Sequence, residues 1–133
     1  MAAFVDSNVV IDVLAAPSAW RAWSTERLLE WVERGPLIVN DIVYAEVSVG
    51  FEEQALLDRS FADLGLERRP MSPDVLFAAG KAFRRYRQSR GSQAAILPDF
   101  LIGAHAAALG TPLITRDPRR FGTYFPTLTL VTP

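Results

Sequence analysis

The chain has 133 residues, half of them apolar, with one histidine, no cysteine and a formal net charge of −1. This length and composition are typical of one folded domain and disfavour a disordered chain. The lack of cysteine excludes disulfides and thiolate metal sites, so a metal ion would need oxygen ligands or His105. The near-neutral charge excludes a uniformly basic surface for nucleic acid and leaves only a local basic patch possible.

The sequence shows no signal for export or membrane insertion. Its apolar beginning lacks a basic segment and contains Asp6 and Asp12. It has no run of about 18 uncharged apolar residues, so no transmembrane helix is expected. We therefore expect a cytoplasmic protein without membrane association, folded as a single domain over residues 1–133.

Apolar runs alternate with helical patterns through the first half of the chain. Capping residues mark the boundaries: Ser7 or Asn8 before the first helix, Ser18 before the second, and Asn40 or Asp41 before the third. The expected elements are a strand at 2–5, helices at 9–16 and 19–34, a strand at 37–39, and helices at 41–50 and 52–64.

The second half continues this alternation. Gly65 is expected to end one helix, and Ser72 followed by Pro73 to begin the next. The expected elements are a strand at 66–69, a helix at 73–89, a loop at 91–93, a helix from Asp99, a strand ending just before Asp117, and a strand at 128–131. This order predicts an α/β fold with three α/β/α layers and a mostly parallel sheet of four to five strands.

Four acidic residues are expected at the same edge of this sheet. Asp6 and Asp117 each follow a strand, and Glu46 lies about one turn into the helix after the second strand. Asp99 begins the helix that leads into the fourth strand, and that helix must run antiparallel to the strand. In open parallel sheets, sites form beyond the carboxyl ends of the strands where the strand order reverses. The topology therefore predicts that the four carboxylates converge.

Each acid also has an interpretation without chemistry. Asp6 is a possible helix cap, Asp99 a partner for a helix dipole, Asp117 a turn residue, and Glu46 part of a solvated helix face. Asp12 is assigned to a cap or a solvated face. The functional interpretation depends on the joint occurrence of the four acids.

Convergence of carboxylates requires a bound cation or bound protons to offset the repulsion between them. Two like charges about 4 Å apart repel by roughly 4 kcal/mol at an effective dielectric constant near 20. A bound cation or bound protons would relieve this repulsion. Carboxylate oxygens without histidine or cysteine suit Mg²⁺ or Mn²⁺, which can activate water and stabilise displacement at phosphorus.

Three segments carry a resemblance to a known family. FVDSNVVIDVL at 4–14 resembles the opening motif of PIN-domain nucleases, VYAEVSVG at 43–50 resembles the segment with their helix-borne acid, and PDFLIGAHAAALGTPLITRDPRRF at 98–121 resembles their closing motif. The resemblance spans the whole chain. Within the family, the chain is most similar to the VapC toxins of bacterial toxin–antitoxin pairs.

The resemblance implies a PIN-like fold and a Mg²⁺- or Mn²⁺-dependent endoribonuclease. Such a type II toxin would cleave structured RNA (tRNA or rRNA) with metal-activated water, bind a cognate antitoxin and form a homodimer. It implies a metal site of Asp6, Asp99 and Asp117, with Glu46 completing the catalytic acids. The implied supporting residues are Thr115, Asn8 and Ser7.

Basic residues beside the fourth acid are candidates for RNA binding. Arg116, Arg119 and Arg120 flank Asp117, and RNA phosphates require local cations in a protein of this net charge. A second basic cluster at 81–90 is interpreted either as an RNA contact or as a solvated helix face.

Two aromatic residues and the histidine have interpretations outside catalysis. Trp20 and Trp23 are assigned preferentially to the core, with an apolar groove for a partner helix as the alternative. His105 follows Asp99 by six residues, roughly 240° around a helix, so it is not expected to share the metal.

Other functions remain to be distinguished from a toxin. A PIN nuclease that processes RNA without an antitoxin and a catalytically silent RNA- or protein-binding module both fit the same residues. A small phosphatase or similar phosphoryl-transfer enzyme is disfavoured because no D-x-D motif follows the first strand and no G-x-x-x-x-G-K-[ST] loop occurs.

Overall fold

A computed structural model describes residues 1–15, 17–89 and 97–133, with the backbone alone described at Arg120. The predicted loop at 91–93 lies outside these residues. The strands are β1 Ala3–Val5, β2 Leu37–Val39, β3 Leu66–Arg68, β4 Leu113–Ile114 and β5 Leu130–Val131. The helices are α1 Ser7–Leu14, α2 Arg21–Val32, α3 Asp41–Ser48, α4 Gln54–Asp63, α5 Pro73–Ser89, α6 Leu97–Leu109 and α7 Pro118–Tyr124.

The five strands form one sheet in the order β3-β2-β1-β4-β5, and every neighbouring pair is parallel. Phe4 in the central strand pairs with Ile38 on one side and Leu113 on the other. The chain builds the sheet outward from β1 in one direction and then returns to its other side, so the strand order reverses at β1. The predicted α/β fold with a parallel sheet is confirmed.

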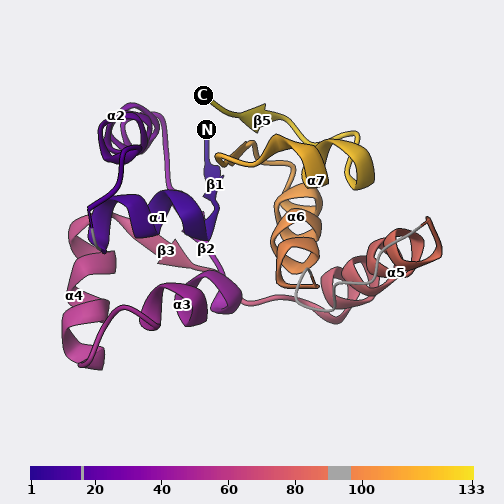
Figure 1. Ribbon diagram of the computed structural model, residues 1–133, viewed down its shortest axis with the longest axis horizontal. Helices are drawn as coiled ribbons and strands as arrows, with labels where there is room; N and C mark the ends of the chain where they lie inside the picture. The colour runs from indigo at the N-terminus through magenta and orange to yellow at the C-terminus, as the bar shows by residue number, and fades with distance from the viewer. Residues whose placement is uncertain (16, 90–96) are drawn as a thin grey trace.

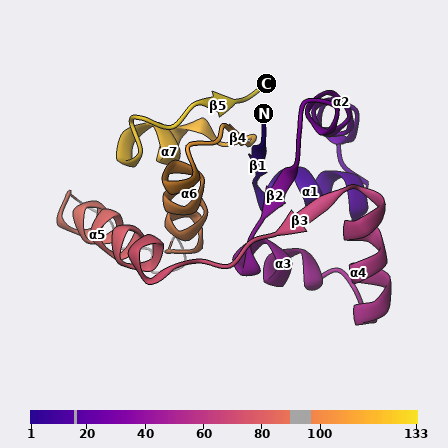
Figure 2. The same cartoon turned by 180° about the vertical axis from the view of Figure 1, so that it is seen from behind.

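The sequences of β1, β2 and β4 are short apolar runs because the centre of the sheet is buried on both faces, whereas the edge strand β3 carries two exposed charged residues. All residues of β1 and β2 are buried. Helices flank the sheet, and α5 packs against α6 and projects away from the remaining elements in both views (Figures 1 and 2). None of the helices in the described part of the chain has the length and apolar character needed to cross a membrane.

Several predicted caps are present in the structure. The Asn40 Oδ1 accepts hydrogen bonds from the backbone N–H groups of Ile42 and Val43, both at 3.1 Å, at the start of α3. Gly65 follows α4 with a φ of 72°, a left-handed conformation that favours glycine. The Ser72 hydroxyl accepts from the Val75 N–H at 3.3 Å before α5.

Two predicted caps are wrong. Asp6 caps α1, in place of Ser7 or Asn8, because its extended backbone lets its carboxylate accept from the Ser7 N–H. Ser18 does not cap α2, which begins after Trp20 without a side-chain cap. The Ser18 hydroxyl accepts from the Trp20 N–H and donates to Asp12 instead. The short helix α7 was not expected from the sequence.

The preferred assignment of both Trp20 and Trp23 to the core is wrong for Trp20. Its side chain is 42% exposed, whereas Trp23 is partly buried against the core. Trp31 is the tryptophan that lies within the core. The sequence pattern places all three tryptophans in one helix. In the structure, Trp20 precedes the first turn of α2 and is therefore not on the helix face that packs against the core.

Candidate active site

The four predicted acids line one pocket with a volume of about 250 Å³. Asp6, Glu46, Asp99 and Asp117 come from four separate elements of the chain, and they meet at the carboxyl edge of the sheet beside β1 and β4. The remaining lining residues are Ser7, Asn8, Ile11 and Phe121. The structure therefore brings together the residues that the topology predicted to converge, and their catalytic role stays a prediction.

Asp6 lies in this arrangement between β1 and α1, directly after the strand and before the helix that it caps. Its side chain is 5% exposed. Its Oδ2 accepts from the Thr115 hydroxyl at 2.7 Å, and its Oδ1 accepts from the Ser7 N–H at 2.7 Å.

The surroundings of Asp6 disfavour its ionised form. Burial raises the pKa of Asp6 from 3.8 to about 7. The Thr115 hydrogen bond lowers this pKa, and the negative charges of Asp99 and Glu46 raise it further. The pocket therefore places at least three carboxylates within electrostatic reach of one another.

Glu46 is held by Ser7, one of the predicted supporting residues. The Ser7 hydroxyl donates a hydrogen bond to the Glu46 Oε1. The orientation of α3, which carries Glu46, is set at its first turn by Asn40, whose Nδ2 donates to the His105 Nδ1 at 3.2 Å. These contacts join the start of α1 to α3, and α3 to α6.

His105 is a packed residue and does not line the pocket. Its side chain is buried, and its ring lies against Phe4 with a centroid separation of 5.2 Å. Burial lowers the pKa of His105 below 6.5. An Nδ1 that accepts a hydrogen bond together with this lowered pKa indicates a neutral imidazole with its proton on Nε2.

Thr115 connects Asp6 to Asp117. Its hydroxyl donates to Asp6 and accepts from the Asp117 N–H at 3.0 Å, and the side chain is fully buried. Asp117 in turn caps α7, where its Oδ1 accepts from the Arg119 N–H at 3.3 Å. The segment after β4 thus fixes the fourth acid relative to the first.

Asp99 lies in the first turn of α6, and the neighbouring Phe100 anchors that turn. The Phe100 ring contacts rings of α5 and of the segment around the end of α7, namely Phe83, Tyr86, Tyr124 and Phe125. A Cβ at Gly103 would lie 2.6 Å from a Phe125 ring carbon, so glycine is needed for this close packing. Aromatic packing therefore holds α6, which carries Asp99, and α7, which begins after Asp117, at a fixed separation.

Arg116 has a partner that the sequence did not indicate. Its Nε and Nη2 atoms donate to the Asp12 carboxylate at 2.7 and 3.0 Å, and its guanidinium lies over the Trp20 ring at 5.6 Å from the centroid. Its backbone N–H donates to the Asn8 Oδ1 at 3.4 Å. The guanidinium that we assigned to RNA is thus engaged within the protein.

The assignment of Asp12 to a cap or a solvated face is wrong. Asp12 is 2% exposed and also accepts from the Ser18 and Ser24 hydroxyls at 2.8 and 2.7 Å. A signal for this role was present in the sequence. Asp12 lies three residues after the buried Val9 within an apolar helix, and an acid on an apolar face requires partners.

Of the remaining basic residues proposed to contact RNA, some are exposed in the structure and others lie outside the described residues. Arg119 is exposed just beyond Asp117, and the side chain of Arg120 lies outside the described residues. On α5, Lys81, Arg84, Arg85 and Arg87 are exposed. Arg90 lies outside the described residues.

The donor chemistry of the pocket fits a hard divalent cation. Its ionisable side chains are carboxylates, which suit Mg²⁺ or Mn²⁺. In the described residues, no group of three acidic, histidine or cysteine side chains is arranged to hold an ion. Magnesium sites commonly use one or two carboxylates and retain several waters, so this arrangement remains compatible with the ion.

Comparisons with known proteins agree with this fold. The PIN domain family model matches residues 3–124. The VapBC2 complex of Rickettsia felis, bound to a promoter DNA fragment, is 18% identical with a TM-score of 0.75, and the match covers 99% of this chain and 98% of that one. VapBC-1 of nontypeable Haemophilus influenzae is 21% identical with a TM-score of 0.71, covering 99% and 98%.

A toxin–antitoxin complex from Klebsiella pneumoniae is 26% identical with a TM-score of 0.68, and the match covers 98% of this chain and 97% of that one. A comparison with curated proteins found no match.

Proposed function

Because the chain belongs to the PIN-domain family, a family of nucleases, we propose that it is a metal-dependent endoribonuclease and the toxin of a type II toxin–antitoxin pair. The observation that carries the proposal is the pocket lined by Asp6, Glu46, Asp99 and Asp117 at the carboxyl edge of the sheet. The similar structures from Rickettsia felis, Haemophilus influenzae and Klebsiella pneumoniae, which are described as VapBC or toxin–antitoxin complexes, support the assignment to a toxin.

In this proposal, Mg²⁺ or Mn²⁺ would bind among Asp6, Asp99 and Asp117, with one or two of these carboxylates as direct ligands and the others held through bound water. When bound, the ion would supply acidity for a water and positive charge for the scissile phosphate. The Ser7 hydroxyl holds Glu46, which we expect to accept a proton from the attacking water. We expect hydrolysis to leave a 5′-phosphate and a 3′-hydroxyl without a covalent enzyme intermediate.

The protonation of Asp6 affects the binding of the cation. Because burial raises the pKa of Asp6 to about 7, this carboxyl must release a proton before it can ligate a metal at neutral pH. Thr115 lowers this barrier by donating a hydrogen bond to the ionised form. We therefore expect the affinity for Mn²⁺ to increase as the pH rises from about 6 to about 8.

For the RNA substrate, we propose contacts from Arg119 and Arg120 to phosphates beside the pocket. Arg119 is exposed and follows Asp117 at the first turn of α7, and Arg120 is next in the chain. Phosphate contacts of this kind make binding depend on salt concentration.

The deciding experiment is cleavage of purified structured RNA, such as tRNA, with and without Mg²⁺ or Mn²⁺. We expect cleavage that a chelator abolishes and that Asp99→Asn reduces to background while the protein stays folded. Cleavage that persists in the chelator contradicts metal dependence. RNA binding without cleavage by the natural sequence identifies a silent binding module instead.

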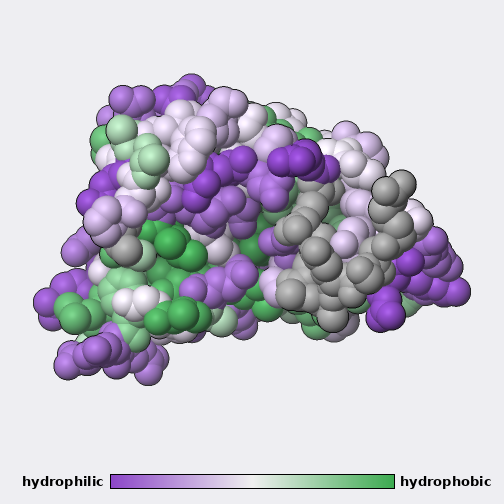
Figure 3. All heavy atoms as spheres, viewed as in Figure 1, coloured by the Kyte–Doolittle hydropathy of each residue, from purple (hydrophilic) through white to green (hydrophobic). Residues whose placement is uncertain are grey.

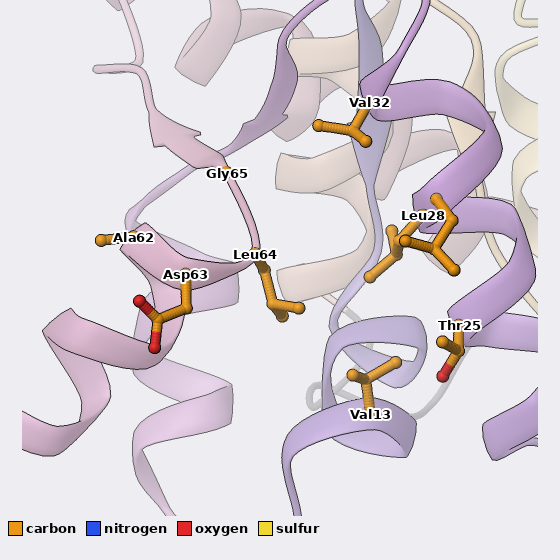
Figure 4. Close-up of a pocket in the computed structure, with 9 residues that line it drawn as sticks. Val13, Thr25, Leu28, Val32, Ala62, Asp63, Leu64 and Gly65 are labelled. Carbon is orange, nitrogen blue, oxygen red and sulfur yellow. The ribbon is translucent and has the colours of Figure 1, made fainter.

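We propose an apolar groove between α1, α2 and the end of α4 as the surface that binds the antitoxin. The groove has a volume of about 230 Å³, and in Figure 4 Val13, Leu28 and Leu64 point into it. Leu29, which also lines it, is 63% exposed. Figure 3 shows a separate apolar area at the lower left of the molecule, where α3 and α4 lie in Figure 1, below α2 and outside this groove. An amphipathic helix or extended segment of an antitoxin would cover such a groove.

This assignment distinguishes a toxin from a processing nuclease. We expect the product of a small neighbouring reading frame to copurify with the chain and to inhibit cleavage. Leu29→Glu should prevent copurification while cleavage of RNA by the isolated chain persists. Leu109→Glu, at an exposed position at the end of α6, serves as the control. A neighbouring product that neither binds nor inhibits supports the processing role. The homodimer is tested by light scattering after size-exclusion chromatography.

A further inference from the structure

Arg116 lies between two residues of the proposed site, and its own side chain points elsewhere. Thr115 donates to Asp6 in the pocket, and Asp117 lines the pocket. The Arg116 guanidinium instead reaches Asp12, which lies within α1, six residues after the Asp6 that caps this helix. Three consecutive residues after β4 are therefore attached to α1 and the pocket by different contacts.

The ion pair between Arg116 and Asp12 is largely buried. Asp12 is 2% exposed, and the Arg116 side chain is 28% exposed. Both guanidinium contacts go to one carboxylate, with Nε at 2.7 Å from Oδ2 and Nη2 at 3.0 Å from Oδ1. Such a bidentate pair fixes direction as well as distance. A buried carboxylate with this geometry holds its arginine in one orientation.

Neutral groups complete the surroundings of the pair. The Ser18 and Ser24 hydroxyls each donate to one Asp12 oxygen, so each oxygen accepts two hydrogen bonds. The Trp20 ring lies against the guanidinium. With these contacts, Arg116 has little freedom to leave Asp12 for a phosphate of the substrate.

We propose that Asp12 and Arg116 form a positioning clamp that holds Thr115 and Asp117 at the acidic pocket and makes no contact with RNA. The clamp acts through the backbone. The Arg116 N–H donates to the Asn8 Oδ1, and this bond fixes the Thr115–Arg116 peptide just before Asp117. Asn8 itself lines the pocket. This inference rests on the proposed nuclease function for its kinetic test, and on the fold alone for its structural test.

The kinetic test separates positioning from substrate binding. Arg116→Gln should lower kcat for RNA cleavage by about 10–100-fold, the usual effect of removing a partner that orients metal ligands. KM and the salt dependence of RNA binding should stay unchanged. Arg119→Gln should show the opposite pattern, with a higher KM and a salt slope that is flatter by about one unit. A raised KM and a flatter slope in Arg116→Gln, with kcat unchanged, would overturn the clamp.

Coupling between the two residues gives a second criterion. If Asp12 and Arg116 act as one unit, the double variant Asp12→Asn/Arg116→Gln should lose no more kcat than the worse single variant. Losses that multiply would overturn the clamp. Arg116→Lys keeps the charge and loses the bidentate contact, so it should fall between the natural protein and Arg116→Gln, and it carries the test if Arg116→Gln does not fold.

A structural readout keeps the clamp separate from the proposed function. The Asp117 N–H donates to Thr115, so its hydrogen exchange reports whether the segment is held. Exchange should become about tenfold faster in Asp12→Asn and Arg116→Lys. It should stay unchanged in Arg34→Gln, which removes an exposed ion pair to Glu30. If the natural protein does not cleave RNA, the nuclease proposal fails and exchange alone decides; unchanged Asp117 exchange would overturn the clamp.

Discussion

The two buried aspartates Asp6, which caps α1, and Asp12, within α1, have nearly the same exposure but opposite surroundings. Asp6 is 5% exposed and Asp12 is 2% exposed. Asp12 faces the Arg116 guanidinium and two serine hydroxyls. Asp6 accepts from one hydroxyl and one backbone N–H, and it faces the negative charges of Asp99 and Glu46.

This difference shows that burial alone does not assign a role to a carboxylate. A buried charge with a cation and hydrogen bonds contributes to a defined geometry. A buried carboxylate whose neighbours are also acidic has a raised pKa, and it is suited to bind a proton or a cation. The first arrangement describes the Asp12 clamp, and the second describes the pocket around Asp6. Substitutions at Asp6 and Asp12 therefore separate the two arrangements.

The largest expected effect is on catalysis. Asp6→Asn should reduce RNA cleavage by about a thousandfold or more, because charge stabilisation by a bound ion is worth several kcal/mol. The variant should fold normally, since the asparagine Oδ1 can accept from the Ser7 N–H and its Nδ2 can donate to the Thr115 hydroxyl oxygen. Single-turnover cleavage and circular dichroism measure the two outcomes. Retained activity in Asp6→Asn would contradict the assignment of the pocket.

The next effect is on the pH dependence of stability in the metal-free protein. The pKa of Asp6 rises from 3.8 in the unfolded reference to about 7 in the folded state, so the folded state keeps this proton as the pH rises. The free energy of unfolding should therefore decrease between these pH values, by on the order of 4 kcal/mol in total.

Urea unfolding at several pH values measures this contribution. The decrease should be absent in Asp6→Asn, and Mg²⁺ should restore stability to the natural protein above pH 7. If the free energy of unfolding changed equally with pH in the natural protein and in Asp6→Asn, Asp6 would already be compensated by its neighbours.

Removal of the paired Asp12 should mainly lower the stability of the folded protein. Asp12→Ala should lower the free energy of unfolding by about 3 kcal/mol, because it leaves the partly buried Arg116 guanidinium without its carboxylate. Urea unfolding at pH 7 gives this value. Glu52→Ala, at an exposed acid, is the matched control and should change it by less than about 0.5 kcal/mol. A small effect in Asp12→Ala would contradict the structural role of the pair.

The smallest effect is expected at a buried titratable residue outside both centres. His105→Gln should cost about 1 kcal/mol of stability, since glutamine can still accept from Asn40. The metal dependence of cleavage should not change. Burial lowers the pKa of His105 below 6.5, so the unfolded chain binds this proton first and the stability from neutral His105 is lost as the pH falls below about 6.5. The variant should lack this loss in acid unfolding experiments.

The sequence predicted the order of elements because the signals are local. Apolar runs such as residues 37–39 mark buried strands, and Asn40, Gly65 and Ser72 mark helix ends through their own conformational preferences. The placement of the four acids followed from one further rule, that the carboxyl ends of parallel strands share one edge. This rule needs only the order of elements.

The partners of individual side chains could not be predicted in the same way. The sequence assigned Arg116 to RNA, Asp12 to a cap or solvent and Trp20 to the core, and the structure joins these three residues to one another. Their contact links positions up to 104 residues apart. No local pattern encodes a contact of this kind, because it depends on how β4 is placed beside β1.

The sequence by itself determined the parallel α/β architecture and the edge at which the acids gather, since short-range periodicity and chain order control both. The tertiary structure decided which acids are compensated. Asp6 and Asp12 have the same residue type and lie six residues apart at and within α1, and only the packing of the segment after β4 gives the Arg116 guanidinium to Asp12 and the Thr115 hydroxyl to Asp6. A carboxylate's charge state depends on the atoms around it, and those atoms are set by packing.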